Sequence, residues 1–332
     1  MPSDLGARLA AVPAVDLSET PATRAAIDAT AGWLGGDAAL AMVAVDPYWP
    51  KWDGPWWAMV ALFELGAADR IPPRIVGAMV AAVGGLLHSF PIRDDEWPAG
   101  ADRRRDTACH CALGCIDQVL ATCGVDVDGA LPWIAPWYAR YQLADGGLNC
   151  DESAYLVTGE CPSSMVGTIA PFEALIRRPA SDVCDRAAAM LIGRQLRLGS
   201  ATVHNAEERA AAPAWAEPCF PRFYFYDVLR GAAALARWAV AHQRALPAAA
   251  VAPVIDHLLA IAGDGVVRVG RVAWAGKQTW RADDGWTARH PAPSTALLDA
   301  LARPGEPSPA LTRQWATVRA DLLTLIDAGR LV

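Results

Sequence analysis

The spacing of hydrophobic and polar residues along the chain predicts a protein made almost entirely of helices. Apolar side chains recur every three or four residues, and no convincing series of segments alternates apolar and polar positions as strands do. The pattern predicts helices over residues 20–34, 55–65, 72–88, 106–122, 130–143, 162–177, 180–196, 221–243, 247–262, 294–301 and 308–328. Pro171 and Pro253 fall inside two of these helices and should kink or interrupt them.

The predicted helices alternate in character. Those beginning near residues 55, 106, 162 and 221 are led by polar or thiol residues and carry many small side chains, whereas those near 72, 130, 180 and 247 are ordinary amphipathic helices. The first set recurs at separations of roughly 51 to 59 residues, which indicates a helix-pair repeat. Because these helices have the composition of segments buried on more than one face, the pairs are expected to close into a ring rather than form an open solenoid.

Composition and net charge limit the kinds of partner that the protein is expected to bind. Apolar residues make up 53% of the chain and charged residues 20%, which is typical of a globular protein. The net charge of -7 argues against nucleic acid and against an anionic membrane surface as partners. The sequence predicts no signal peptide and no membrane span, so we expect a cytoplasmic protein that acts on a small molecule; its oligomeric state is left open.

Cysteines at the predicted helix starts suggest a metal site. Cys161-Pro162 and Cys219-Phe220-Pro221 each place a thiol close to a Pro at the first helical position, and the free N–H groups of a helix N-terminus favour a thiolate. If the inner helices are parallel, these starts gather at one mouth of a cavity, together with Cys111 about one turn inside its own helix. Cys111, Cys161 and Cys219 are therefore predicted to bind zinc, with copper as the alternative.

Other residues are assigned around that site. Proton-transfer candidates are Glu160, Asp53 and His110. Tryptophans at the start of one inner helix are predicted either to line a substrate pocket or to pack between helices: Trp52, Trp56 and Trp57. Cys150 either joins the metal site or is exposed, whereas three further cysteines are interpreted as small buried hydrophobic residues: Cys109, Cys123 and Cys184.

Three motifs carry a family resemblance. The turn Asp145-Gly146-Gly147-Leu148-Asn149-Cys150 precedes a predicted helix that begins Pro162-Ser163-Ser164. Together with Phe220-Pro221-Arg222-Phe223-Tyr224 and the Trp-rich stretch from Trp52 to Trp57, it resembles the repeats of the terpenoid-cyclase and protein-prenyltransferase superfamily, which contains the squalene cyclases. The resemblance covers residues 30–260 and the last helix.

The resemblance implies an all-α fold, an α/α toroid of five to six helix pairs around a central cavity. Residues 1–332 would form one domain, with 263–293 a lid or an insertion. Protein prenyltransferases hold a catalytic zinc at the corresponding end of the toroid through carboxylate, Cys and His ligands, and Glu160-Cys161 lies at a comparable helix start. This chain departs from that pattern, because Gly159 stands where the carboxylate ligand is expected and no equivalent His is evident.

Two functional hypotheses follow, from different classes of protein. The first is a metal-dependent transferase or lyase that uses a thiolate-bound metal at the cavity mouth to activate a small or partly apolar substrate. The alternative is a metal-free protein that cyclises or binds isoprenoids in a cavity lined by tryptophan and aliphatic groups. A scaffold that only mediates protein contacts is a third interpretation, and it predicts no thiol cluster.

Overall fold

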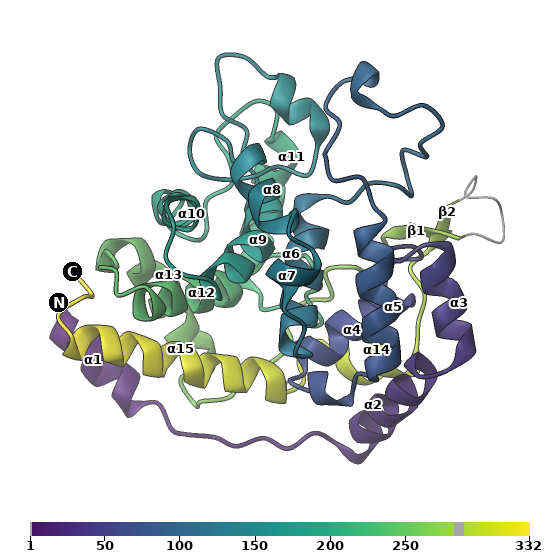
Figure 1. The fold of residues 1–332 in the computed structure, drawn as a ribbon. Helices are drawn as coiled ribbons and strands as arrows, with labels where there is room; N and C mark the ends of the chain where they lie inside the picture. Colours follow the sequence, from purple (N-terminus) through teal and green to yellow (C-terminus); the bar gives the residue numbers. More distant parts are fainter. Residues whose placement is uncertain (1, 282–288) are drawn as a thin grey trace.

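A computed structural model describes residues 2–281 and 289–332, and helices form most of it (Figure 1). The prediction of an all-α fold is confirmed, with the addition of one small antiparallel sheet, β1 (Gln278–Trp280) and β2 (Arg289–Pro291). This hairpin lies in the segment 263–293 that was predicted to be a lid or an insertion. Residues 282–288 of that segment lie outside the described residues.

The helices begin and end close to the positions that the hydrophobic pattern predicts. Four of them, which we call the inner helices, are buried over most of their surface: α4 (Pro55–Glu64), α6 (His110–Thr122), α9 (Met165–Ile176) and α12 (Val228–Ala241). The other α-helices are α1 (Pro2–Ala11), α2 (Pro21–Leu34), α3 (Asp37–Val45), α5 (Pro73–Gly84), α7 (Val127–Ala130), α8 (Ile134–Tyr141), α10 (Asp182–Gly193), α11 (Ala206–Ala211), α13 (Ala248–Ala262), α14 (Ala296–Leu301) and α15 (Pro309–Asp327). Short 3-10 turns are η1 (Ala68–Arg70), η2 (Asp94–Glu96), η3 (Glu152–Leu156) and η4 (Ala212–Ala216).

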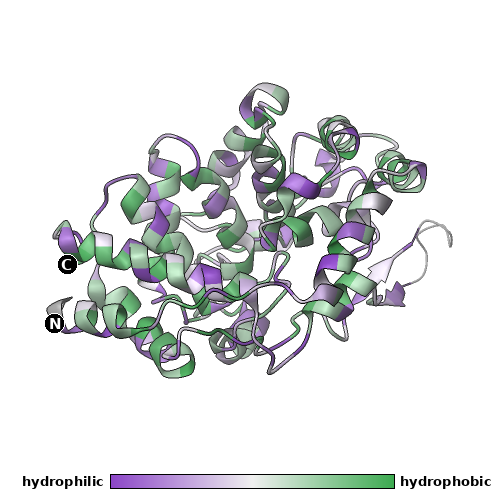
Figure 2. Cartoon of the chain, turned by 90° about the horizontal axis from the view of Figure 1, so that it is seen from below, coloured by the Kyte–Doolittle hydropathy of each residue, from purple (hydrophilic) through white to green (hydrophobic). Residues whose placement is uncertain are grey.

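The inner helices form a continuous row in which each helix contacts the next. α4 packs on α6, α6 on α9 and α9 on α12, and α15 lies against the far side of α12. α8, α10 and α13 lie outside α6, α9 and α12 respectively, so an outer helix follows an inner one along the chain. Seen from below in Figure 2, polar and apolar residues alternate along most helices, as expected for helices with one face in the core.

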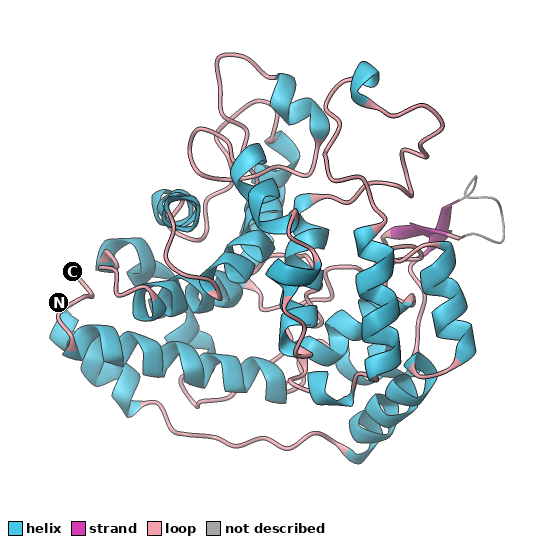
Figure 3. Ribbon diagram, in the orientation of Figure 1, coloured by secondary structure: helices cyan, strands magenta, loops and turns pink. Residues whose placement is uncertain are grey.

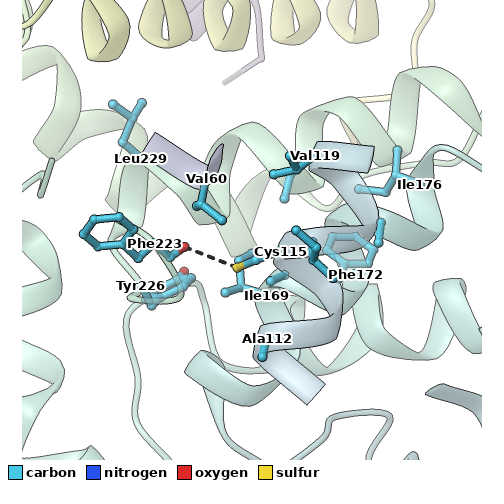
Figure 4. Packing of buried hydrophobic residues seen from close by; sticks show 14 of the residues in the cluster. Val60, Ala112, Cys115, Val119, Ile169, Phe172, Ile176, Phe223, Tyr226 and Leu229 are labelled. Atoms are coloured by element: carbon cyan, nitrogen blue, oxygen red, sulfur yellow. Dashed lines mark hydrogen bonds between the residues drawn. The ribbon is translucent and has the colours of Figure 1, made fainter. Parts of the chain in front are cut away.

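The contact between α6 and α9 is unusually close. A Cβ atom added to Gly114 would lie 2.3 Å from the backbone of both Ala170 and Pro171, so only glycine fits at this position. Pro171 lies within α9 without ending it, which excludes the break but not the kink that was predicted there, and its ring rests against the surface that Gly114 leaves open. Figure 4 shows Ile169, Phe172 and Val119 in the same layer of the core.

Long connections extend from one end of this helical array. In Figures 1 and 3 the chain between α5 and α6 and the chain between α8 and α9 rise together above the helices as loops with short helical turns. Each loop leads into the start of an inner helix, so residues far apart in the sequence meet there. Within the described ranges, no helix combines the length and the apolar character required to cross a membrane.

Candidate metal centre

Three cysteines come together where these loops meet. Cys109 and Cys111 stand at the start of α6, and Cys150 comes from the loop after the Gly146-Gly147 turn. Their Sγ atoms all lie within 4.8 Å of one another. The Cys109 and Cys111 sulfurs are 3.2 Å apart, and the backbone N–H of Cys111 donates to the Cys150 sulfur at 3.4 Å. Among the described residues this is the one group of at least three His, Cys, Asp or Glu residues with the spacing of a metal site.

The starting point of α6 explains why Cys109 belongs to this group. The predicted helix began at Asp106, which would have placed Cys109 on an apolar helix face. In the structure α6 begins at His110, and Cys109 is its N-cap residue with extended backbone angles, φ -94° and ψ 166°. Its side chain makes no capping hydrogen bond, which leaves the sulfur beside that of Cys111 rather than in the core.

The loop that carries Cys150 is fixed by its backbone. Gly146 has φ +94°, and a Cβ atom there would lie 2.1 Å from the carbonyl oxygen of Arg186, so the turn requires glycine. After the turn, the N–H of Ser164 donates to the Leu148 carbonyl at 2.8 Å. The Asn149 side chain donates to the Pro162 carbonyl at 2.6 Å, which places Cys150 directly after a doubly anchored residue.

His110 links the two thiol-bearing segments. The indole N–H of Trp137 donates to Nδ1 of His110 at 2.7 Å, and Nε2 lies 2.8 Å from the hydroxyl of Tyr155. Because an indole can only donate, Nδ1 carries no proton, and the neutral ring must donate from Nε2 to Tyr155. The same hydroxyl accepts the backbone N–H of Asn149 at 3.2 Å, so hydrogen bonds connect α6 to the residue before Cys150.

Burial keeps this histidine neutral. Removal from water lowers the pKa of His110 to about 4, although the nearby Cys109 opposes the shift. Both ring nitrogens are already engaged in hydrogen bonds. The structure thus places His110, a predicted proton-transfer candidate, between the two thiol-bearing segments, in a position that orients the thiols.

A lysine lies over the same centre. Nζ of Lys51 is 4.8 Å from the ring centroid of Tyr224, 5.0 Å from that of Trp49 and 5.2 Å from that of Tyr48. Burial lowers the pKa of Lys51, whereas the charges of the three cysteines raise it. The lysine is partly buried and therefore interacts electrostatically with the thiols from among the aromatic rings.

The three thiols do not ionise alike. Hydrogen bonds from Cys111 and Cys150, helped by the charge of Lys51, hold the pKa of Cys109 well below its usual range. Hydrogen bonding to Cys109 and burial raise the pKa of Cys111, and the same contacts with Cys109 raise that of Cys150. Cys109 is therefore the thiol of the cluster that most readily becomes a thiolate.

Cys161 and Cys219 lie apart from this cluster. α9 begins at Met165 with Ser164 as its cap, and α12 begins at Val228 with Asp227 as its cap, so neither cysteine stands at the helix start predicted for it. Cys161 lies beside Asp145, and burial raises its pKa. Cys219 is fully buried, its N–H and thiol donate to Asp227 at 3.0 and 3.5 Å, and burial raises the pKa of its thiol well above the usual range.

The two carboxylates predicted to transfer protons, Glu160 and Asp53, hold loop segments in place. Glu160 accepts the backbone N–H groups of Val203 and His204 at 3.0 and 3.1 Å. Asp53 forms an ion pair with Arg281 at 2.6 Å, which ties the start of α4 to the segment carrying β1. Neither residue belongs to the group of metal-ligating side chains.

The predicted substrate-binding tryptophans form a layer beneath the lysine. Trp56 and Trp57 are fully buried and pack edge-on against Tyr48, with ring centroids 5.6 and 5.1 Å away. Trp57 also contacts Tyr224 and donates its N–H to the Tyr48 carbonyl at 2.8 Å. Trp52 stacks on Trp274 instead. Trp56 and Trp57 thus support two of the three rings around Lys51.

No protein-family model, curated protein or solved structure matches the chain. The chemistry of this protein is therefore inferred from the residues of its sites.

A large cavity lies on the side of the segment 222–224 that faces away from the thiol cluster. It has a volume of about 740 Å³, and residues of α4, α6, α9, α12 and α15 line it. Phe223 faces this cavity, whereas the next residue, Tyr224, covers Lys51. Figure 4 shows Cys115 of α6 directed at the carbonyl oxygen of Phe223, which accepts its thiol at 3.5 Å. The segment therefore separates the thiol cluster from the cavity.

Charged residues in the cavity wall are matched to partners. Arg230 forms an ion pair with Glu173 at 2.6 Å and donates to the carbonyls of Phe223 and Phe225. Glu64 accepts the N–H groups of Arg222 and Phe223 at 2.7 and 2.6 Å, and burial raises its pKa to about 7. These groups hold the 222–224 segment in place.

Proposed function

We propose that Cys109, Cys111 and Cys150 bind a zinc ion and that the protein is a metal-dependent enzyme. One observation carries the proposal: three sulfurs from two separate segments lie within 4.8 Å of one another. Zinc–sulfur bonds of about 2.3 Å in tetrahedral geometry separate sulfurs by about 3.8 Å, so small side-chain shifts are enough to bring the three ligands into place.

The number of ligands favours catalysis over a structural role. Structural zinc sites usually have four protein ligands, whereas catalytic sites have three and keep one position for water or substrate. The described residues supply three. Zinc at such a position acts as a Lewis acid and lowers the pKa of a bound water or thiol.

Charge balance supports zinc over copper(I). Three thiolates and Zn²⁺ leave one negative charge, and the positive charge of Lys51 nearby offsets part of its cost. Copper(I) would leave two negative charges against the same lysine. The aromatic rings of Tyr48, Trp49 and Tyr224 provide an apolar surface at the centre, which suits a small, partly apolar substrate.

Residues outside the ligand set would hold the metal ligands in position. His110 and Tyr155 would hold the two ligand segments together, as hydrogen-bonded residues behind metal ligands commonly do. We further propose that the row of inner helices belongs to an α/α toroid like that of the prenyltransferase and squalene-cyclase repeats. The contacts from α4 through α6 and α9 to α12 support that arrangement. A transferase or lyase reaction fits a site of this kind.

Elemental analysis of protein purified without chelators or nickel tests the proposal. We expect about one zinc ion per chain, as a site with three thiolates holds. C109S, C111S and C150S should each lose the metal and remain folded. C161S and C219S are the matched controls and should retain it. Loss of metal in the controls would restore the ligand set predicted from the helix starts, and absence of zinc and copper from the wild type would remove the metal centre altogether.

The cavity of about 740 Å³ favours a second candidate function, a metal-free protein that binds or cyclises isoprenoids. Its size suits a ligand with several isoprene units, and Val60, Phe63 and Ile176 contribute apolar wall. This candidate predicts binding of prenyl diphosphates that survives chelation and blocking of the thiols.

A further inference from the structure

Lys51 presents its ammonium group among aromatic rings beside the thiol centre. Three aromatic rings surround its ammonium group at 4.8 to 5.2 Å from their centroids. Among the residues that the structure describes, none accepts a hydrogen bond from Nζ or forms an ion pair with it. Lys51 is only partly buried, so the donors of its ammonium group stay open to a molecule that enters from solvent, while the aromatic faces stabilise its charge.

The backbone around Lys51 is held so that the side chain keeps this direction. The N–H of Lys51 donates to the hydroxyl of Thr279 at 2.6 Å, and that threonine is fully buried on β1. On one side the Trp49 indole donates to the Arg104 carbonyl at 3.1 Å, and on the other Asp53 pairs with Arg281. The lysine is thus presented from a clamped segment rather than from a free surface loop.

The sequence adds an independent observation. Of 29 lysines and arginines in the chain, only Lys51 and Lys277 are lysines. Lys277 is exposed one residue before β1, and its charge lowers the pKa of Lys51. A compact ammonium fits between three rings as a point charge, whereas arginine would present a flat, extended guanidinium.

We propose that Lys51 is the substrate-recognition residue of the centre and that it binds the carboxylate of a small organic acid. The strongest electrostatic influences on Lys51 come from the three thiols and Lys277, and among the described residues no ion pair joins its ammonium group to a carboxylate. A single ammonium matches a monoanion better than a phosphate dianion, and the three rings suit the organic part of such a molecule. This inference rests on the proposed function, because the metal's open position would hold the reacting group while Lys51 holds the carboxylate.

The protein with cobalt(II) in place of zinc tests the proposal, because thiolate-bound cobalt has visible absorption bands. Acetate and benzoate should perturb these bands saturably in the wild type. K51M and K51Q should each weaken that binding at least about tenfold, the loss of one charge-assisted hydrogen bond. K277M is the matched control and should stay within about twofold of the wild type.

The outcomes separate this inference from the metal centre. Cobalt loading with equal benzoate affinity in K51M and wild type would overturn the role of Lys51 and leave the metal centre standing. Tighter binding of inorganic phosphate than of benzoate would overturn the carboxylate assignment.

Failure of the wild type to bind cobalt would refute the metal centre itself, and a second measurement keeps Lys51 testable in that case and if the variants do not fold. Wild-type protein is acetylated with an N-hydroxysuccinimide ester, with and without benzoate, and the two lysines are followed by peptide mass spectrometry. Selective protection of Lys51 supports the inference, and equal acetylation of Lys51 with and without benzoate overturns it.

Discussion

The thiol centre and the large cavity lie on opposite sides of the 222–224 segment. The two sites differ in whether their charged groups have partners within the protein. In the cavity wall each buried charge has a protein partner: Arg230 has Glu173, Arg222 has Asp227, and Glu64 has two backbone N–H groups. At the thiol centre, three sulfurs from two segments face one another, and the described residues give the ammonium of Lys51 no hydrogen-bond acceptor.

This comparison shows that a cavity with many charged residues is not for that reason a functional site. Matched charges in the cavity hold the segment 222–224 and stabilise the packing of α9 on α12. Unmatched groups at the thiol centre are costly for folding alone, and a ligand would compensate them. The smaller site is therefore the better candidate for chemistry.

The largest contrast should appear in thiol reactivity. Cys109 and Cys115 lie on the same helix, but hydrogen bonds lower the pKa of Cys109, whereas burial raises that of Cys115 to about 12. In protein freed of metal by chelation, iodoacetamide at neutral pH should alkylate Cys109 at least about a thousandfold faster, because the thiolate is the reactive form. Peptide fragmentation by mass spectrometry assigns the modified residue. Equal labelling rates would show that the thiol centre has no special electrostatic character.

Breaking a matched pair in the cavity should destabilise the fold strongly without touching the metal. R230M leaves the carboxylate of Glu173 without its cation, and loss of one partner of a buried pair costs about 3–5 kcal/mol. Urea unfolding measures the loss, and the zinc content of the folded fraction should remain that of the wild type. R237M, which changes an exposed arginine at the cavity rim, is the control and should shift stability by less than about 0.5 kcal/mol.

Glu64 should make stability depend on pH. Because burial raises its pKa from 4.5 to about 7, the folded chain keeps a proton between these pH values that the unfolded chain loses. Its contribution is therefore fully present below pH 4.5 and is lost as the pH rises through about 7, at most about 3 kcal/mol. Urea unfolding at pH 5 and pH 8 should show this fall in the wild type and a flatter profile in E64Q. E152Q changes an exposed glutamate and should leave the profile as it is; the same slope in E64Q would assign the effect to other groups.

The smallest expected effect tests the link between the two ligand segments. Y155F removes the hydroxyl that joins His110 to the N–H of Asn149, so zinc affinity should fall by about 10–100-fold, as for other residues behind metal ligands. Competition with a chelating dye measures the affinity. Tyr138 is the matched control, since its buried hydroxyl faces Asp117 rather than the ligand segments, and Y138F should leave zinc binding unchanged.

Much of the fold could be predicted because local rules decide it. Pro55 begins a helix as predicted, and the helix predicted from Pro72 begins at Pro73. The periodic apolar stripes place α4, α6 and α9 within a few residues of their observed starts, whereas α12 begins at Val228 rather than at Pro221. α3 was missed because it is apolar almost throughout and shows no periodic stripe. α1 was not predicted either, as its ten residues give few positions from which to recognise a helical pattern.

The site was harder to predict because it depends on loops. The Cys109-x-Cys111 spacing was a visible signal, but the interpretation of Cys109 as a core thiol assumed a helix start that the structure moves to His110. Cys150 reaches its place only through the contacts of Asn149 and Tyr155, which no local rule reveals. Cys161 and Cys219 were chosen because Pro162 and Pro221 looked like helix starts, whereas the caps at Ser164 and Asp227 decide where α9 and α12 begin.

The interlock between Gly114 and Pro171 has a consequence for the metal-free protein. Because the backbones of α6 and α9 are in close contact there, we expect the start of α6 to keep its position when a metal is removed. Zinc fingers, by contrast, unfold when they lose their metal. Such a protein would lose and rebind its metal many times without unfolding. The metal supply would then determine its activity but not its lifetime.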